Sequence, residues 1–129
     1  MSEDDSRNEA VCTACREVAG ALHDAALFAL AEIAAASALR VPWQGIRCET
    51  RGKRRHSTAR QTAFYLARRV GDLDFMVISR LSGRERTTVR HGFDSIARAR
   101  GRSGLDWRLA VLEQAVASGL TSVFDNLAD

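Results

Sequence analysis

The stretch DFMVISRLSGRERTTVRHGFDSIARA, residues 74–99, decides the fold. Its apolar residues recur at helical spacing on both sides of a central Ser82-Gly83-Arg84. Asp74 stands where a helix N-cap is expected, and glycine between two polar residues is typical of a tight turn. We therefore predict helices at about 74–81 and 85–99, joined by a short turn. Their predicted buried residues are Val77, Ile78, Leu81, Val89, Phe93 and Ile96.

Two helices joined by a short glycine turn form the helix-turn-helix plan, in which the start of the second helix reaches the base edges of DNA. The residues at that start are Arg84, Glu85, Arg86, Thr87 and Thr88. Arginine can bind guanine with two hydrogen bonds, and threonine offers a hydroxyl and a methyl group. A helix N-terminus also attracts phosphate. The competing interpretation is that the two threonines only cap or pack at a helix start.

A helix that starts at Ser57 or Thr58 and ends at Gly71 is predicted upstream of this pair. Thr58 and Gln61 have the spacing of a capping box, and Gly71 stands where a C-cap favours glycine. Gln61 is explained equally well as a cap partner or as a contact to DNA. The predicted buried residues are Ala63, Leu66, Ala67 and Val70.

The N-terminal part is predicted to be a helical arm from about Asn8 to Leu39, weakened or broken at Gly20 and ended by Pro42 and Gly45. Intramolecular packing is the first interpretation of its apolar stripe, and dimerisation through this helix stays open. The stripe comprises Val11, Cys15, Val18, Leu22, Ala25, Ala29 and Ile33. A last helix is predicted at 106–118 with Trp107, Val111, Leu112 and Ala115 inward, and a short turn after Leu120. The architecture is all-α with five or six helices.

Charge is strongly segregated along the chain. Residues 1–50 hold four arginines and eight acidic residues, whereas residues 51–102 hold fourteen basic and four acidic residues. Seven basic residues and no acidic one lie between Arg51 and Arg69. A basic segment between acidic flanks is typical of polyanion binding. A solvated basic face is the alternative interpretation.

Three segments resemble the DNA-binding domain (domain IV) of the bacterial replication initiator DnaA. GRERTTVRHGFDSI, residues 83–96, is similar to the family signature G-R-D-H-T-T-V-x-H-A, and ARQTAFYLAR, residues 59–68, is similar to P-R-Q-x-A-x-x-L-A-K. RGKRRHST, residues 51–58, resembles the basic loop of that family. The resemblance covers residues 50–118 and implies a helix-turn-helix domain of the DnaA C-terminal and Trp-repressor-like type at residues 50–129. Residues 1–49 are then an acidic N-terminal helical arm and connector.

The resemblance also implies roles for individual residues. Thr87 and Thr88 match base- and phosphate-contacting threonines, and Arg68 matches a phosphate-contacting lysine. Arg60 and Gln61 match the pair beside the DNA backbone, and the loop Lys53 to Arg55 matches the part that enters the minor groove. The complete predicted DNA-binding set is Lys53, Arg54, Arg55, Arg60, Gln61, Arg68, Arg84, Arg86, Thr87, Thr88 and His91. For His91, a role without DNA is an equal alternative.

The sequence departs from the family pattern in two ways. Arg86 replaces the histidine before the threonines and Glu85 replaces an aspartate, which puts the exact DnaA-box preference in doubt. The chain also contains no G-x-x-x-x-G-K-[ST] loop, so it lacks the ATPase of the initiator. The predicted function is sequence-specific binding to double-stranded DNA that regulates replication initiation or transcription. The alternative is a protein-interaction module that binds DnaA or another replication protein.

Other functional classes have weak support in the sequence. No catalytic triad, carboxylate pair or metal cluster has convincing spacing, so we expect neither an enzyme nor a cofactor or metal. Cys12, Cys15, His23 and Cys48 suggest zinc, but the first two lie within a predicted helix. The acidic N-terminus is unlike a secretory signal, and the apolar run Ala25 to Leu39 is too short for a bilayer. We expect no membrane partner and a cytoplasmic, nucleoid-associated bacterial protein.

Overall fold

The structure is a computed structural model that describes residues 2–47, 54–102 and 104–128, without the side chains of residues 2–11, 124, 127 and 128. Its secondary structure over these ranges is entirely helical, which confirms the all-α prediction. The elements are α1 (Ser2–Leu39), α2 (Trp43–Ile46), α3 (Arg54–Gly71), α4 (Phe75–Ser82), α5 (Arg86–Arg100) and α6 (Leu105–Ala128).

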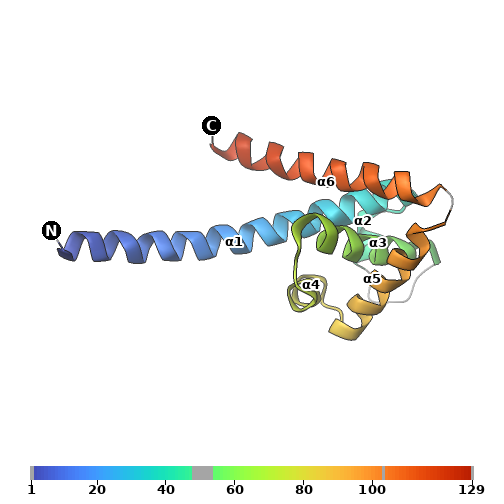
Figure 1. The fold of residues 1–129 in the computed structure, drawn as a ribbon, viewed down its shortest axis with the longest axis horizontal. Helices are drawn as coiled ribbons and strands as arrows, with labels where there is room; N and C mark the ends of the chain where they lie inside the picture. Colours follow the sequence, from blue (N-terminus) through green and yellow to red (C-terminus); the bar gives the residue numbers. More distant parts are fainter. Residues whose placement is uncertain (1, 48–53, 103, 129) are drawn as a thin grey trace.

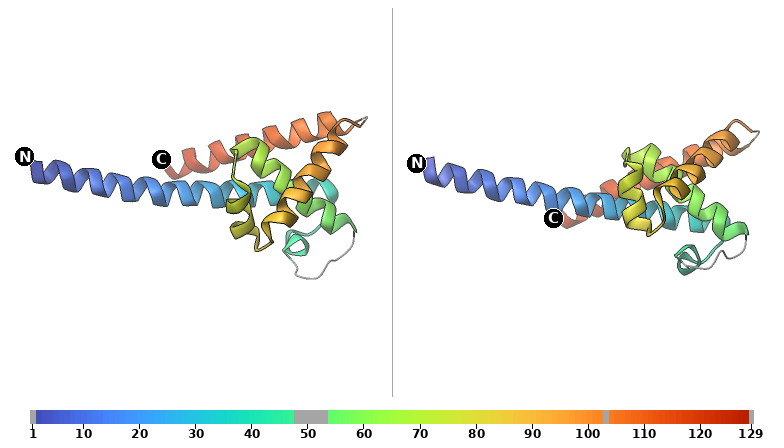
Figure 2. Two further views of the ribbon diagram at one scale, coloured as in Figure 1. Left: turned by 60° about the horizontal axis from the view of Figure 1, so that its bottom comes forward. Right: turned by 90° about the horizontal axis from the view of Figure 1, so that it is seen from below.

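The helix α1 is the longest element of the molecule, and α6 returns beside its second half in the opposite direction, so that the N-terminal half of α1 extends beyond the end of α6 (Figure 1). The helices α3, α4 and α6 pack against α1, and within the described residues α5 packs against α3, α4 and α6 without contacting α1. Two further views show the first half of α1 projecting beyond these helices as a separate arm (Figure 2). The helix α3 packs against both α1 and α5, so it links the long helix to the surface described below.

The main core joins the second half of α1 to all the helices that follow α2. Its fully or almost fully buried side chains are Leu27, Phe28, Ala31, Phe64, Leu66, Ala67, Leu73, Ile78, Val89 and Val116. Most of the predicted inner residues of the three central helices lie here or pack against this cluster, which confirms those faces. A Cβ atom added to Gly71 would overlap Cδ2 of Leu27. Gly71 is therefore required by the close packing of α3 on α1, and the left-handed residue that ends α3 is Asp72 (φ 51).

The connection between α4 and α5 agrees with the prediction in detail. The side chain of Asp74 accepts a hydrogen bond from the backbone N–H of Met76 and caps α4. Gly83 ends the helix in the left-handed region (φ 70), where glycine is favoured, and its N–H donates to the carbonyl of Ser79. The hydroxyl of Ser79 donates to the carbonyl of Arg84, which fixes the turn from a second side.

Several predicted boundaries are wrong. The helix α1 begins at Ser2 and continues through Gly20, and Pro42 stands at the N-cap of the short helix α2. The helix α3 begins at Arg54, so Thr58 lies inside it and its hydroxyl donates to the carbonyl of Arg54. The capping box of Thr58 with Gln61 is therefore not formed. The helix α6 continues to Ala128 instead of ending near residue 118.

Two predicted buried faces are also wrong. In α1 the predicted stripe is exposed at Val18 (61%), Leu22 (60%) and Ile33 (45%), while Leu27 and Phe28 are buried. In α6 the predicted inner residues Trp107, Val111 and Ala115 are exposed, and Leu109 and Val116 are buried in their place. Because these alanine-rich helices are apolar on more than one side, periodicity alone does not identify the side that packs.

Within the described residues, Cys12–Leu39 is one helical segment of 28 residues that is long and apolar enough to cross a membrane. It is longer than the run Ala25 to Leu39 on which the sequence-based expectation rested. Core helices of soluble proteins pass the same test of length and composition. Leu27, Phe28 and Ala31 of this segment belong to the main core.

Candidate nucleic-acid interface

A groove lies between the first half of α3 and the start of α5. It collects six residues of the predicted DNA-binding set, which are Arg54, Arg60, Gln61, Arg84, Thr88 and His91. Ser57, Phe64, Gly83 and Glu85 complete its lining. Residues 34 positions apart in the sequence, such as Arg54 and Thr88, therefore border a single surface.

The other side of the first turns of α5 borders a second concave surface. Arg86 and Thr87 lie there together with Arg90 from the next turn and with Asp74 and Phe75 from the start of α4. The sequence analysis missed Arg90, although its spacing of four residues from Arg86 places both on one side of a helix. The start of α5 thus presents different side chains to two adjacent hollows.

The two threonines do not act as the N-cap of α5. That position belongs to Glu85, whose side chain makes no capping hydrogen bond. Thr87 and Thr88 lie within the first turn and both are exposed. The capping alternative is therefore wrong, and both threonines are exposed at a helix start.

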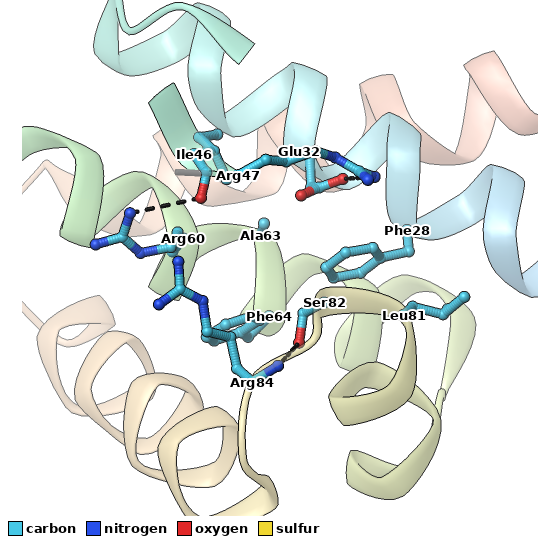
Figure 3. Close-up of a pocket in the computed structure, with 10 residues that line it drawn as sticks. All are labelled: Phe28, Glu32, Ile46, Arg47, Arg60, Ala63, Phe64, Leu81, Ser82 and Arg84. Carbon is cyan, nitrogen blue, oxygen red and sulfur yellow. Dashed lines mark hydrogen bonds and ion pairs between the residues drawn. The ribbon is translucent and has the colours of Figure 1, made fainter. Parts of the chain in front are cut away.

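Arg60 and Arg84 connect the groove to a cavity of about 120 Å³ behind it (Figure 3). Arg60 is 9% exposed and one of its guanidinium nitrogens donates to the carbonyl of Ile46 at 3.4 Å. This bond holds α2 against α3. The backbone N–H of Arg84 donates to the hydroxyl of Ser82 at 3.2 Å, so the turn positions Arg84 where the cavity and the groove meet.

Glu32 is a buried carboxylate in this region that was not among the site residues predicted from the sequence. It is 3% exposed and accepts a hydrogen bond from Arg47 at 2.7 Å (Figure 3). Burial raises the pKa of its carboxyl group, and the hydrogen bonds from Arg47 and Trp43 oppose this rise. The guanidinium of Arg47 also lies over the Trp43 ring, 5.0 Å from its centroid. Glu32 is the one acidic residue in the apolar run Ala25 to Leu39, and a carboxylate in such a run indicates a buried group that needs a cationic or hydrogen-bonding partner.

The pair formed by Glu32 and Arg47 anchors the chain just before the basic stretch. Arg47 is the last described residue ahead of that stretch, and Arg54 is the first residue after the gap. Lys53 lies outside the described residues. Arg54 and Arg55 are both exposed in the first turn of α3, and Arg54 lines the groove.

Arg68 lies apart from the groove, at the end of α3. Its guanidinium donates to the carbonyl of Leu73 at 3.2 Å, pairs with Asp72 at 3.4 Å and lies 5.2 Å from the centroid of the Phe75 ring. Phe75 also lines the hollow with Arg86 and Thr87. Arg68 therefore supports the loop between α3 and α4 on the side of the second hollow.

The zinc interpretation finds no cluster among the residues that the structure describes. Cys12 and Cys15 are exposed free thiols, and no group of three His, Cys, Asp or Glu side chains in the described ranges lies close enough to hold a metal ion. Cys48 lies outside those ranges.

The chain matches no family model, and no curated protein or solved structure is significantly similar to it.

Proposed function

We propose that this chain binds double-stranded DNA, with the start of α5 in the major groove and the start of α3 beside the phosphate backbone. The observation that carries the proposal is the groove that combines exposed residues of the first turns of α5 with Arg54 in the first turn of α3. In a helix-turn-helix plan with α4 and α5 as its two helices, the start of α5 would reach the base edges and α3 would lie beside it.

In this proposal, different side chains contact the bases and the phosphates. Arg86, Thr87 and Thr88 have the donors and methyl groups that read base edges, and Glu85 can accept from a cytosine amino group. Arg54 and Arg55 contribute charge that attracts phosphate without reading sequence. The uncapped N–H groups at the start of α5 add a site for one phosphate oxygen.

The resemblance of residues 50–118 to the DnaA domain suggests the kind of target. In this proposal the chain occupies DnaA-box-like sites and regulates replication initiation or transcription through occupancy, because it has no ATPase motif. Arg86 in place of histidine is expected to shift the preferred base near the centre of the contact.

The test is a fluorescence anisotropy titration of the full chain against a duplex with a DnaA box and a scrambled duplex, at several salt concentrations. We expect at least about tenfold tighter binding to the box, which corresponds to about 1.4 kcal/mol. Affinity should fall steeply with salt because phosphate contacts release counterions. Equal, salt-sensitive binding to both duplexes supports DNA binding at another site. No binding to either contradicts the proposal and favours a protein-interaction module, with DnaA as the first partner to test.

Three exposed residues separate the proposed roles. Thr88→Ala should lower the preference for the box, whereas Arg54→Ala should weaken both duplexes alike and reduce the salt slope by about one. Arg98→Ala is the matched control, because it removes one exposed arginine from the far end of α5. A variant of Thr88 and a variant of Arg54 that lose preference equally would contradict this division.

A further inference from the structure

The first half of α1 is a helix whose described side chains are exposed. Every described residue from Cys12 to Leu22 is exposed, and the arm projects away from the other helices in both views of Figure 2. Isolated helices of this length are only marginally stable in water. The exposed arm therefore needs a partner to account for a continuous helix from Ser2 to Leu39.

The apolar stripe on this arm has the spacing of a coiled coil. Val18, Leu22, Ala25 and Ala29 follow one another at steps of four, three and four residues, and Ile33 extends the stripe over the core region. Val18, Leu22 and Ile33 are 61%, 60% and 45% exposed. The helix α6 leaves this side open, because it meets α1 on another side, where Leu30 approaches Gly119.

The distribution of large and small residues along the stripe indicates what kind of helix can cover it. In the centre of the stripe, the large residues Val18 and Leu22 come first and the alanines Ala25 and Ala29 follow. In a parallel pair, large residues would face large ones and alanine would face alanine, which leaves gaps between the alanines. In an antiparallel pair of two copies, each layer joins one large residue and one alanine, so the spacing between the helices is even.

The charge of the arm favours the same arrangement. The segment 2–11 contains four acidic residues and one arginine in its sequence. A parallel pair would bring these two acidic segments together, which is unfavourable. An antiparallel pair places each one beside the end of the neighbouring α1, where Arg40 is exposed.

We propose that α1 pairs with α1 of a second copy of this chain in an antiparallel coiled coil. Val18 then packs against Ala29 of the partner subunit, and Leu22 packs against Ala25 of the partner subunit. This interface does not depend on DNA binding, so the failure of either proposal leaves the other standing.

Sedimentation velocity of the full chain tests the association. We expect a dimer that Leu22→Glu weakens at least tenfold, because two unpaired carboxylates would be buried in the interface. Gly20→Glu is the matched control, since it adds the same charge to the same arm where no side chain lies within 4 Å. A monomer at the highest concentration, or a dimer that Leu22→Glu leaves unchanged, would overturn the proposal. Sedimentation of the monomer with vesicles would assign the stripe to a membrane instead.

Disulfide trapping tests the direction. In a background of Cys12→Ser, Cys15→Ser and Cys48→Ser, the variants Val18→Cys and Ala29→Cys are oxidised separately and as a mixture. The antiparallel arrangement predicts a crosslink only in the mixture, because positions 18 and 29 of one helix lie about 16 Å apart along its axis and a disulfide needs Cα atoms within about 7 Å. A crosslink in either separate sample indicates a parallel pair and overturns the proposal.

Discussion

The two halves of α1 form one continuous helix but have opposite surroundings. Residues 12–22 are exposed along their whole length, whereas Leu27, Phe28 and Ala31 lie in the centre of the core. Residues 2–20 contain three alanines and five acidic residues, whereas residues 21–39 contain nine alanines and two acidic residues. Both halves nevertheless carry apolar side chains at helical spacing. The helices α3, α4 and α6 pack against α1 and cover its second half. Which of the apolar side chains of α1 are buried therefore depends on where these neighbouring helices lie.

The test with the largest expected effect on stability replaces one leucine in each half of α1. Leu27→Ala removes a side chain that is 0% exposed and should lower the free energy of unfolding by about 2–5 kcal/mol. Leu22→Ala removes one that is 60% exposed and should change it by less than about 0.5 kcal/mol. Urea unfolding at a protein concentration where the chain is monomeric measures both. Similar losses in the two variants would contradict the contrast.

The second test adds one methyl group in each half. Gly71→Ala forces a Cβ atom into Leu27, which has no exposed side to move to, so we expect a loss of about 1–3 kcal/mol. Gly20→Ala meets nothing within 4 Å and should gain about 0.5–1 kcal/mol through helix propensity.

A double-mutant cycle connects these two tests. If the contact is the cause, Gly71→Ala should cost much less in the Leu27→Ala background than in the native chain. An unchanged cost would show that the strain lies in the backbone at the end of α3.

The smallest test concerns the buried charge beside the core. Because the folded pKa of Glu32 is raised, the folded chain binds a proton more readily than the unfolded chain. The contribution of Glu32 to stability is then fully present when the pH is below the pKa of the unfolded chain, near 4.5. It is lost as the pH rises through the pKa of the folded chain. The melting temperature of the native chain relative to Glu32→Gln should therefore increase as pH falls from neutral. A flat or opposite difference would show that the ion pair with Arg47 outweighs burial.

The local parts of the fold could be predicted from the sequence, and the long-range parts could not. The turn at Gly83, the cap at Asp74 and the inner face of α5 depend on neighbouring residues, and all three are confirmed. The outward faces of Val18 and Trp107 depend on where other helices lie, and no local pattern reports that. The start of α3 was misplaced because Thr58 and Gln61 have the spacing of a cap but lie within a helix.

The candidate site shows the same division. The exposed residues at the start of α5 were predicted from the turn that precedes them. The link from Glu32 through Arg47 to the basic stretch spans 15 residues and joins two helices, so only the folded structure brings it together.

The continuity of α1 fixes more than its own shape. Because α1 has no break between Ser2 and Leu39, a partner that binds the first half of α1 is held at a fixed angle and distance from the basic surface. Adding seven residues to the first half of α1 would lengthen the helix by about 10 Å and return its apolar stripe to nearly the same side. Adding two residues would instead rotate the stripe by about 200° around the helix axis. The length of α1 would thus set both the distance and the relative rotation between the bound partner and the basic surface.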